Sequence, residues 1–230
     1  MEEHAGPDCL PKEPFDIHAV FRRLRRVCAA LPKAALFELR DRGRRTPFEQ
    51  LVAAVISVRT RDETTLPVAE ALFARARTPE EVLNLSPEEL ERLLAPAAFS
   101  EAKARQIRAA SALILERWNG ALPADADALR SLPGVGPKVA GLVLALGFGV
   151  PAIAVDVHVH RITNRWGYVS TRTPEQTRAE LYERLPRAYW VEINERLVPF
   201  GKFVCTGRRP KCSTCALLSQ CRQVGVTDHG

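Results

Sequence analysis

The chain has 230 residues, of which 46% are hydrophobic and 26% are charged. This length allows one large domain or two modest ones, and the apolar fraction excludes a wholly disordered chain. No apolar run approaches the roughly 18 residues of a membrane span, which excludes a helical membrane protein. Lysine and arginine number 33 against 27 acidic residues, a formal net charge of +6. This balance favours a polyanionic partner without identifying one.

The predicted elements are almost all helices. Residues 1–14 combine glycine, prolines and mixed charge, which predicts a disordered arm. Residues 15–31 show helical spacing of apolar side chains. Thr46, Pro47 and Glu49 predict a capped helix start, and the apolar run 51–56 predicts that this helix is buried. Similar starts occur at 78–81, 86–89, 122–125 and 173–175, and residues 102–118 form a long predicted helix that ends at 119–120. We therefore expect an all-α fold of about ten helices.

Residues 132–140 read LPGVGPKVA and join two predicted helices. Gly134 and Gly136 permit positive φ angles, and their lack of side chains lets backbone N–H groups approach a phosphate. Pro137 suits the first turn of the next helix, whose N-terminal dipole favours an anion. Two interpretations are open. One is a helix–hairpin–helix that grips a DNA backbone through Gly134, Val135 and Gly136, and the other is an ordinary glycine-rich turn.

Lys138 directly follows this hairpin, and Asp156 ends the apolar run 153–155. The position of Asp156 predicts the N-cap of another helix. A lysine amine and a carboxylate are also the residue types of a nucleophile and its partner. The alternative is a solvated lysine and a plain capping aspartate.

Four cysteines near the C-terminus follow the pattern C-x6-C-x2-C-x5-C. They are Cys205, Cys212, Cys215 and Cys221. Structural zinc usually takes two tight C-x2-4-C pairs, and only one pair here is that tight. One close pair flanked by two looser cysteines suits the wider [4Fe–4S] cube. Zinc and a disulfide remain open as alternatives. No secretory signal is present, so the sequence does not indicate the oxidising compartment in which a disulfide would persist. Cys9 and Cys28 are expected to be incidental thiols.

Taken in order, the motifs LPGVG-x-K, V-D-x-H-x-x-R and C-x6-C-x2-C-x5-C resemble those of the endonuclease III family of base-excision DNA glycosylases, over about residues 15–221. The resemblance implies two helical lobes with a DNA cleft between them. A six-helix barrel domain with the helix–hairpin–helix would span 39–150, and an iron–sulfur cluster domain would combine 15–38 with 151–230. It also implies a [4Fe–4S] cluster on the four cysteines and a monomer that binds double-stranded DNA with damaged bases or abasic sites. We expect a cytoplasmic protein at the bacterial nucleoid or, in a eukaryote, one in the nucleus or mitochondrion.

The same resemblance implies the chemistry. Lys138 would attack C1′ of a flipped nucleoside with help from Asp156, and the resulting Schiff base would permit β-elimination. The expected activity is that of a glycosylase and AP lyase acting on oxidised pyrimidines. Adenine-mismatch relatives lack the lysine and carry a glutamate on the buried helix, where residues 53–55 of this chain have no carboxylate. The alternative is a cluster-containing DNA-binding paralogue with weak or altered activity.

Two positions depart from the family pattern. Arg59 stands where the family commonly has an amide, and Phe99 lies in a G-[LF]-Y-like position between Ala98 and Ser100. Both are expected to fill the gap that a flipped base leaves. For Phe99 the alternative is a core aromatic.

A basic run lies within the first cysteine loop and is expected to contact phosphates. Its members are Arg208, Arg209 and Lys211. The alternative is a solvated charge cluster. His158 and His160 are expected to be structural.

Overall fold

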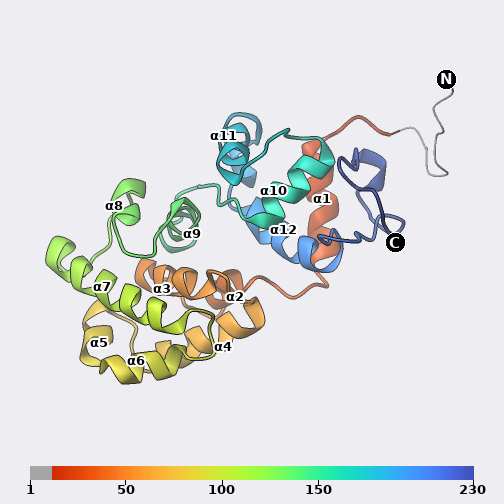
Figure 1. Cartoon of the computed structure of the whole chain (residues 1–230). Coiled ribbons are helices and arrows are strands. Elements are labelled where there is room, and N and C mark those ends of the chain that lie inside the picture. Colours follow the sequence, from red (N-terminus) through yellow and green to blue (C-terminus); the bar gives the residue numbers. More distant parts are fainter. Residues whose placement is uncertain (1–11) are drawn as a thin grey trace. The chain divides into compact units, whose positions relative to one another are not determined.

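The computed structural model describes residues 12–230, which form twelve α-helices and two short 3-10 helices without a strand in that range (Figure 1). The prediction of an all-helical chain is confirmed. The expected number, about ten, was too low because α2 (Ala35–Asp41) and α4 (Asp62–Phe73) begin without a capping side chain, so no start signal marks them in the sequence. Within residues 12–230 no helix has the length and apolar character needed to cross a membrane.

The chain divides into two units, each of which is named here for its main motif. The hairpin unit is Ala34–Ala154, and the cysteine unit combines the described residues up to Lys33 with Val155–Gly230. The helices of the hairpin unit are α2 (Ala35–Asp41), α3 (Pro47–Ser57), α4 (Asp62–Phe73), α5 (Pro79–Asn84), α6 (Pro87–Leu94), α7 (Ser100–Trp118), α8 (Ala126–Arg130) and α9 (Pro137–Gly147).

Helix α3 forms the centre of the hairpin unit. It begins with the predicted capping box, in which Thr46 accepts from the Glu49 N–H and the Glu49 carboxylate accepts from the Thr46 N–H. Its residues from Phe48 to Ile56 are buried, and it packs against α2, α4, α7 and α9. A Cβ on Gly147 at the end of α9 would lie 2.7 Å from the Pro47 Cα, so only glycine allows this approach. The apolar run therefore makes α3 the core, as predicted.

The remaining predicted helix starts are also confirmed. Side chains cap the first turns of α5, α6, α8 and α11 (Pro174–Arg184); the capping residues are Thr78, Ser86, Asp125 and Thr173. The long helix α7 ends at Asn119, which is left-handed and is followed by Gly120. In Figure 1, α7 runs beside the short helices α5 and α6, with which it packs.

The cysteine unit is built on α12 (Glu192–Phe203), which packs against α1 (Ile17–Cys28) and α10 (Val157–Trp166). The 3-10 helix η1 (Arg187–Tyr189) brings Tyr189 onto Phe21, with ring centroids 4.0 Å apart. The second 3-10 helix, η2 (Leu218–Gln220), lies within the cysteine segment. Aromatic and aliphatic side chains thus form a core that supports the loops around the cysteines.

Most of the predicted arm, including Cys9, lies outside the described residues. Where the description begins, the Lys12 ammonium donates to the Leu218 carbonyl at 3.1 Å. The Glu13 N–H donates to the Ser219 carbonyl at 2.7 Å. These bonds connect the start of the described chain to η2.

Candidate functional site

The glycine-rich hairpin joins α8 to α9. Gly134 has a φ of +78°, which requires glycine, whereas Gly136 is extended with a φ of −91°. Both glycines are exposed, while Leu132 and Val135 are buried beneath them. The Val135 N–H donates to the Leu132 carbonyl at 3.2 Å. Val135, predicted as a DNA contact, therefore anchors the turn with its side chain and uses its own N–H inside the hairpin.

Lys138 is the second residue of α9 and is half-buried. Helix α9 starts at Gly136 without a capping side chain and has Pro137 in its first turn. The unmatched N–H groups at such an N-terminus, together with the helix dipole, favour an anion. The hairpin unit thus places an amine directly beside a feature suited to a phosphate.

Asp156 is the N-cap of α10 in the cysteine unit, as predicted. Its Oδ1 accepts from the N–H groups of His158 and Val159, both at 2.9 Å. Its Oδ2 accepts from the Asn194 side-chain amide at 3.5 Å. One carboxylate oxygen therefore holds the helix start, and the other accepts a long bond from an amide.

Arg59 and Phe99 come together in the hairpin unit, although 40 positions separate them in the sequence. The Arg59 guanidinium carbon lies 5.7 Å from the centroid of the Phe99 ring. Both side chains line a pocket of about 280 Å³ that Lys103, Gln106 and Gly134 also border. Phe99 is 61% exposed, so the alternative of a core aromatic is wrong. The two residues expected to fill a gap in DNA share one pocket edge with the hairpin.

Lys103 is a residue of this pocket that the sequence analysis missed. It is 3% exposed, and its ammonium donates to the carbonyls of Ile56 and Val58 at 2.6 and 2.8 Å and to the Thr60 hydroxyl at 2.7 Å. Burial lowers the pKa of this ammonium to about 8. A signal was present, because Lys103 falls on the same helical stripe as the buried Ile107 and Ile114.

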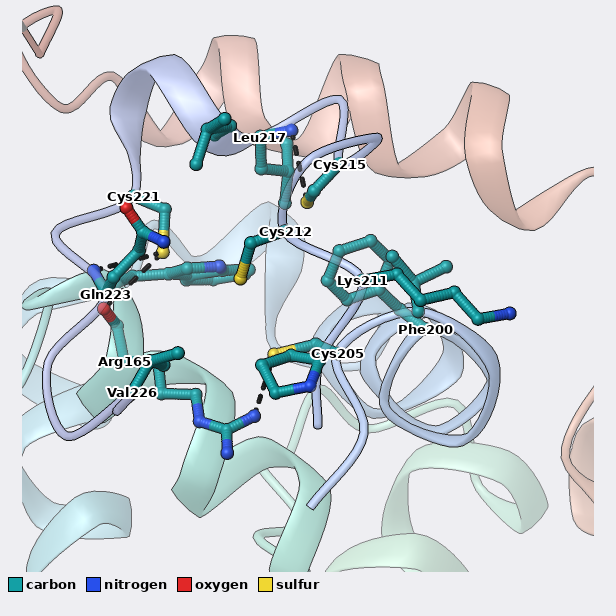
Figure 2. A pocket seen from close by; sticks show the side chains of 14 residues that line it. Arg165, Phe200, Cys205, Lys211, Cys212, Cys215, Leu217, Cys221, Gln223 and Val226 are labelled. Atoms are coloured by element: carbon teal, nitrogen blue, oxygen red, sulfur yellow. Dashed lines mark hydrogen bonds between the residues drawn. The ribbon is translucent and has the colours of Figure 1, made fainter. Parts of the chain in front are cut away.

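The four cysteines of the C-terminal pattern line one pocket, together with Arg165, Trp166 and Phe200 (Figure 2). All four are free thiols, so the alternative of a disulfide is wrong for them. Backbone N–H groups of Leu217 and Gln223 donate to the sulfurs of Cys215 and Cys221 at 3.5 and 3.4 Å. In kind and number these donors fit a thiolate-bound cluster, whose sulfurs commonly accept such bonds, although their present arrangement does not enclose a metal ion. Among the described residues, no group of three or more His, Cys, Asp and Glu side chains is arranged to hold a metal ion.

Burial favours the protonated form of three of these thiols. It raises the pKa of Cys215 and of Cys221 to about 11, and it also raises the pKa of Cys212. Because thiolates are the metal-binding form, a metal must displace protons when it binds here.

Two buried or half-buried arginines of α10 hold the loop after Cys205. Arg165 donates to the Cys205 sulfur at 3.4 Å (Figure 2). It also donates to the carbonyls of Thr206 and Gly207 at 2.6 and 2.7 Å. Arg161 donates to the Cys205 carbonyl at 2.9 Å. In the sequence Arg161 stands out only as the end of the V-D-x-H-x-x-R motif, and no motif marks Arg165, which lies one helical turn further along.

The basic run is exposed. Arg208, Arg209 and Lys211 all face solvent in the loop between Cys205 and Cys212. Arg209 also lies 3.5 Å from the Asp228 carboxylate, a distance typical of a weak surface pair. These cations are accessible to a large anion.

The residues expected to be structural have packing roles. The His158 ring packs closely against Gly201, where a Cβ would collide with it. The His160 ring lies 2.6 Å from the Thr177 hydroxyl. Cys28 is buried, and its thiol donates to the Arg196 carbonyl at 3.4 Å.

Comparison with known proteins agrees with this arrangement. The model of the HhH-GPD superfamily base excision DNA repair protein matches residues 52–187. Endonuclease III of Thermotoga maritima is 43% identical over 175 residues, which cover 76% of this chain and 82% of the relative. The chain belongs to the endonuclease III family. It is an HhH-GPD superfamily base excision DNA repair protein.

Solved structures of the family have the same fold. A structure described as a non-covalent Endonuclease III–DNA complex has a TM-score of 0.79 and 32% identity, and the match covers 90% of this chain and 94% of that chain. Another, described as a trapped Endonuclease III–DNA covalent intermediate, has a TM-score of 0.76 and 32% identity, with 91% and 97% covered. The family resemblance expected from the motifs is confirmed.

Proposed function

We propose that the protein is a bifunctional DNA glycosylase and AP lyase that removes oxidised pyrimidines from duplex DNA. The observation that carries this proposal is the position of Lys138, one residue inside the uncapped start of α9 and directly behind the exposed glycine hairpin. A family member that has been trapped covalently on DNA supports the covalent step.

In the proposed reaction the neutral Nζ of Lys138 attacks C1′ of a flipped nucleoside. A C–N bond forms at C1′, the glycosidic bond breaks, and its electron pair leaves with the base, which takes up a proton. The sugar ring then opens to a Schiff base. Loss of a C2′ proton expels the 3′ phosphate, which cleaves the strand by β-elimination.

Asp156 has a different part in the proposal. Its carboxylate stabilises the positive charge that develops on the sugar and helps transfer protons. The two N–H bonds that Oδ1 accepts at the start of α10 fix the orientation of this carboxylate. A capping aspartate is thus positioned before substrate arrives.

Double-stranded DNA with damaged bases or abasic sites is the proposed partner, bound by a monomer. Exposed Gly134 and Gly136 present backbone to one phosphate, and Arg208, Arg209 and Lys211 supply cations for others. Such contacts position the duplex without reading its sequence. The proposed location is wherever genomic DNA lies, which means the bacterial nucleoid or a eukaryotic nucleus or mitochondrion.

The proposed cofactor is a [4Fe–4S] cluster held by Cys205, Cys212, Cys215 and Cys221. Four free thiols on one pocket, two of them accepting backbone N–H bonds, support this assignment. When bound, such a cluster cross-links the segment that carries the basic run. Arg165 then holds the same loop through the carbonyls of Thr206 and Gly207.

The test is borohydride trapping on a duplex with thymine glycol and on a duplex with an abasic site. We expect wild-type protein to form a covalent adduct with both duplexes and Lys138→Gln to form none, because only a primary amine gives the reducible imine. Lys211→Gln, which removes an exposed lysine, should still form the adduct at saturating protein. An adduct of unchanged yield from Lys138→Gln would overturn the assignment of the nucleophile.

The presence of an arginine at position 59 supports a second candidate function. Arg59 replaces an amide expected at the pocket edge, and its guanidinium lies over Phe99. The candidate is a DNA-binding paralogue with weak or altered glycosylase activity. The same assay separates the two, because that paralogue would trap on the abasic duplex without releasing the base from thymine glycol.

A further inference from the structure

The turns that carry Arg59 and Phe99 share an unusual backbone conformation. Arg59 has a φ of +53° and Phe99 has a φ of +57°, both in the left-handed region that residues with side chains seldom adopt. Such a conformation persists only where the surrounding structure holds it. The two turns therefore need a restraint from outside themselves.

The Lys103 ammonium supplies that restraint to the first turn. Its three N–H donors match the three oxygens it contacts, which belong to Ile56, Val58 and Thr60 at 2.6, 2.8 and 2.7 Å. Ile56 is in the last turn of α3, and Val58 follows the helix. Carbonyls at a helix C-terminus lack partners within the helix, and the helix dipole favours a cation there.

Thr60 extends the restraint to the second turn. Its hydroxyl oxygen accepts from the Lys103 ammonium at 2.7 Å and from the Ala98 N–H at 3.2 Å. Ala98 directly precedes Phe99, and Thr60 directly follows Arg59. One ammonium and one hydroxyl thus connect both left-handed turns to α7.

We propose that Lys103 is a positioning residue that, through Thr60, holds Arg59 and Phe99 together as a single two-residue wedge for the gap left by a flipped nucleotide. This inference rests on the proposed function, because it assigns a structural basis to the step in which the base is flipped. The burial of Lys103 at 3% exposure supports it, since an ammonium is seldom buried unless its hydrogen bonds are satisfied. The contact of the guanidinium with the Phe99 ring shows that the two side chains already form one surface.

The test measures binding, not turnover. The duplex carries a tetrahydrofuran abasic analogue opposite 2-aminopurine, whose fluorescence rises when a wedge unstacks it. We expect Lys103→Met to lose most of that rise and to bind this duplex about tenfold more weakly, a typical size for coupled residues in one network. Its affinity for an undamaged duplex should not change, because the hairpin and the basic run are intact. Arg92→Met, which removes an exposed cation of α6, is the matched control and should resemble wild type.

Coupling distinguishes positioning from general support. If Lys103 acts through the wedge, Lys103→Met combined with Arg59→Ala should weaken binding to the abasic duplex by clearly less than the sum of the two single losses. Thr60→Val is a milder variant, because it leaves Lys103 its two carbonyls and removes only the hydroxyl that reaches Ala98. It should reduce the fluorescence rise in the same direction, so the test does not depend on how well Lys103→Met folds.

Additive losses in the double variant, or an equal loss on undamaged DNA, would contradict the inference. Base release from thymine glycol by wild-type protein, measured beside it, reports on the proposed function separately. If the base is released from thymine glycol but the losses of binding are additive, only the wedge assignment is wrong. If the losses of binding are coupled but no base is released, only the proposed glycosylase activity is wrong.

Discussion

At the scale of single residues, Asp156 combines a structural task with a proposed chemical one. Its Oδ1 caps α10 through two N–H groups, whereas its Oδ2 accepts a 3.5 Å bond from the Asn194 amide. Capping needs an oxygen acceptor, but stabilising a cationic sugar needs a negative charge. A substitution that keeps the oxygen and removes the charge separates the two tasks.

We therefore expect Asp156→Asn to fold with nearly wild-type stability and to release damaged bases about 10²-fold more slowly, the scale of a lost acid–base group. Denaturant unfolding and single-turnover base release measure the two effects. Asp16→Asn is the control, because Asp16 caps α1 with a similar bond to the His18 N–H. If both variants lost the same activity, capping alone would account for the role of Asp156.

At the scale of one element, the hairpin contains two glycines with different requirements. Gly134 has positive φ, and a Cβ there would lie 2.7 Å from the Gln106 Oε1. Gly136 has negative φ, and no atom lies within 4 Å of a Cβ added to it. The first glycine is needed to build the turn, and the second is needed, in our proposal, only to let a phosphate approach.

Gly134→Ala should lower the free energy of unfolding by ~1–2 kcal/mol, because alanine is strained at positive φ. Gly136→Ala should leave the stability of the free protein unchanged and should weaken binding to any duplex, damaged or not. Thermal unfolding without DNA and equilibrium binding with DNA measure the pair. Unchanged DNA affinity for Gly136→Ala would exclude the hairpin backbone as a phosphate contact.

At the scale of the whole molecule, the cysteine segment depends on residues distant in the chain. Lys12 donates to Leu218 at one end, and Arg165 of α10 holds the loop that leads into Arg208. A cluster bound to the four thiols would cross-link the chain segments that carry these cysteines. Its loss should therefore affect DNA binding through the basic run.

Purified protein should contain about four iron atoms per chain, as a [4Fe–4S] cluster requires. Cys212→Ser should lose iron, become less soluble and bind duplex DNA more weakly, because the loop with Arg208 and Arg209 loses its anchor. Cys28→Ala removes a buried thiol outside the cysteine pattern and should retain its iron. Metal analysis of anaerobically prepared protein is the measurement, and one zinc in place of iron would reject the cluster.

Much of the local structure could be read from short segments. Thr46, Thr78 and Asp156 were predicted as helix starts and cap helices as expected, because a capping side chain bonds to N–H groups only two or three residues away. Phe99 was left open between wedge and core. Its exposure depends on what packs over it, which no neighbouring residue specifies.

By itself the sequence determined the all-helical fold, the capped helix starts and the motifs that indicate the family, because periodicity and capping act within a few residues. Only the tertiary structure decided that Arg59 and Phe99 meet, that four cysteines line one pocket, and that Lys103 is buried beneath both turns. Lys103 reaches oxygens more than 40 positions away, and it does so because α3 packs against α7. Contacts between separate elements depend on how helices pack, and that geometry is a property of the folded chain, not of any one segment.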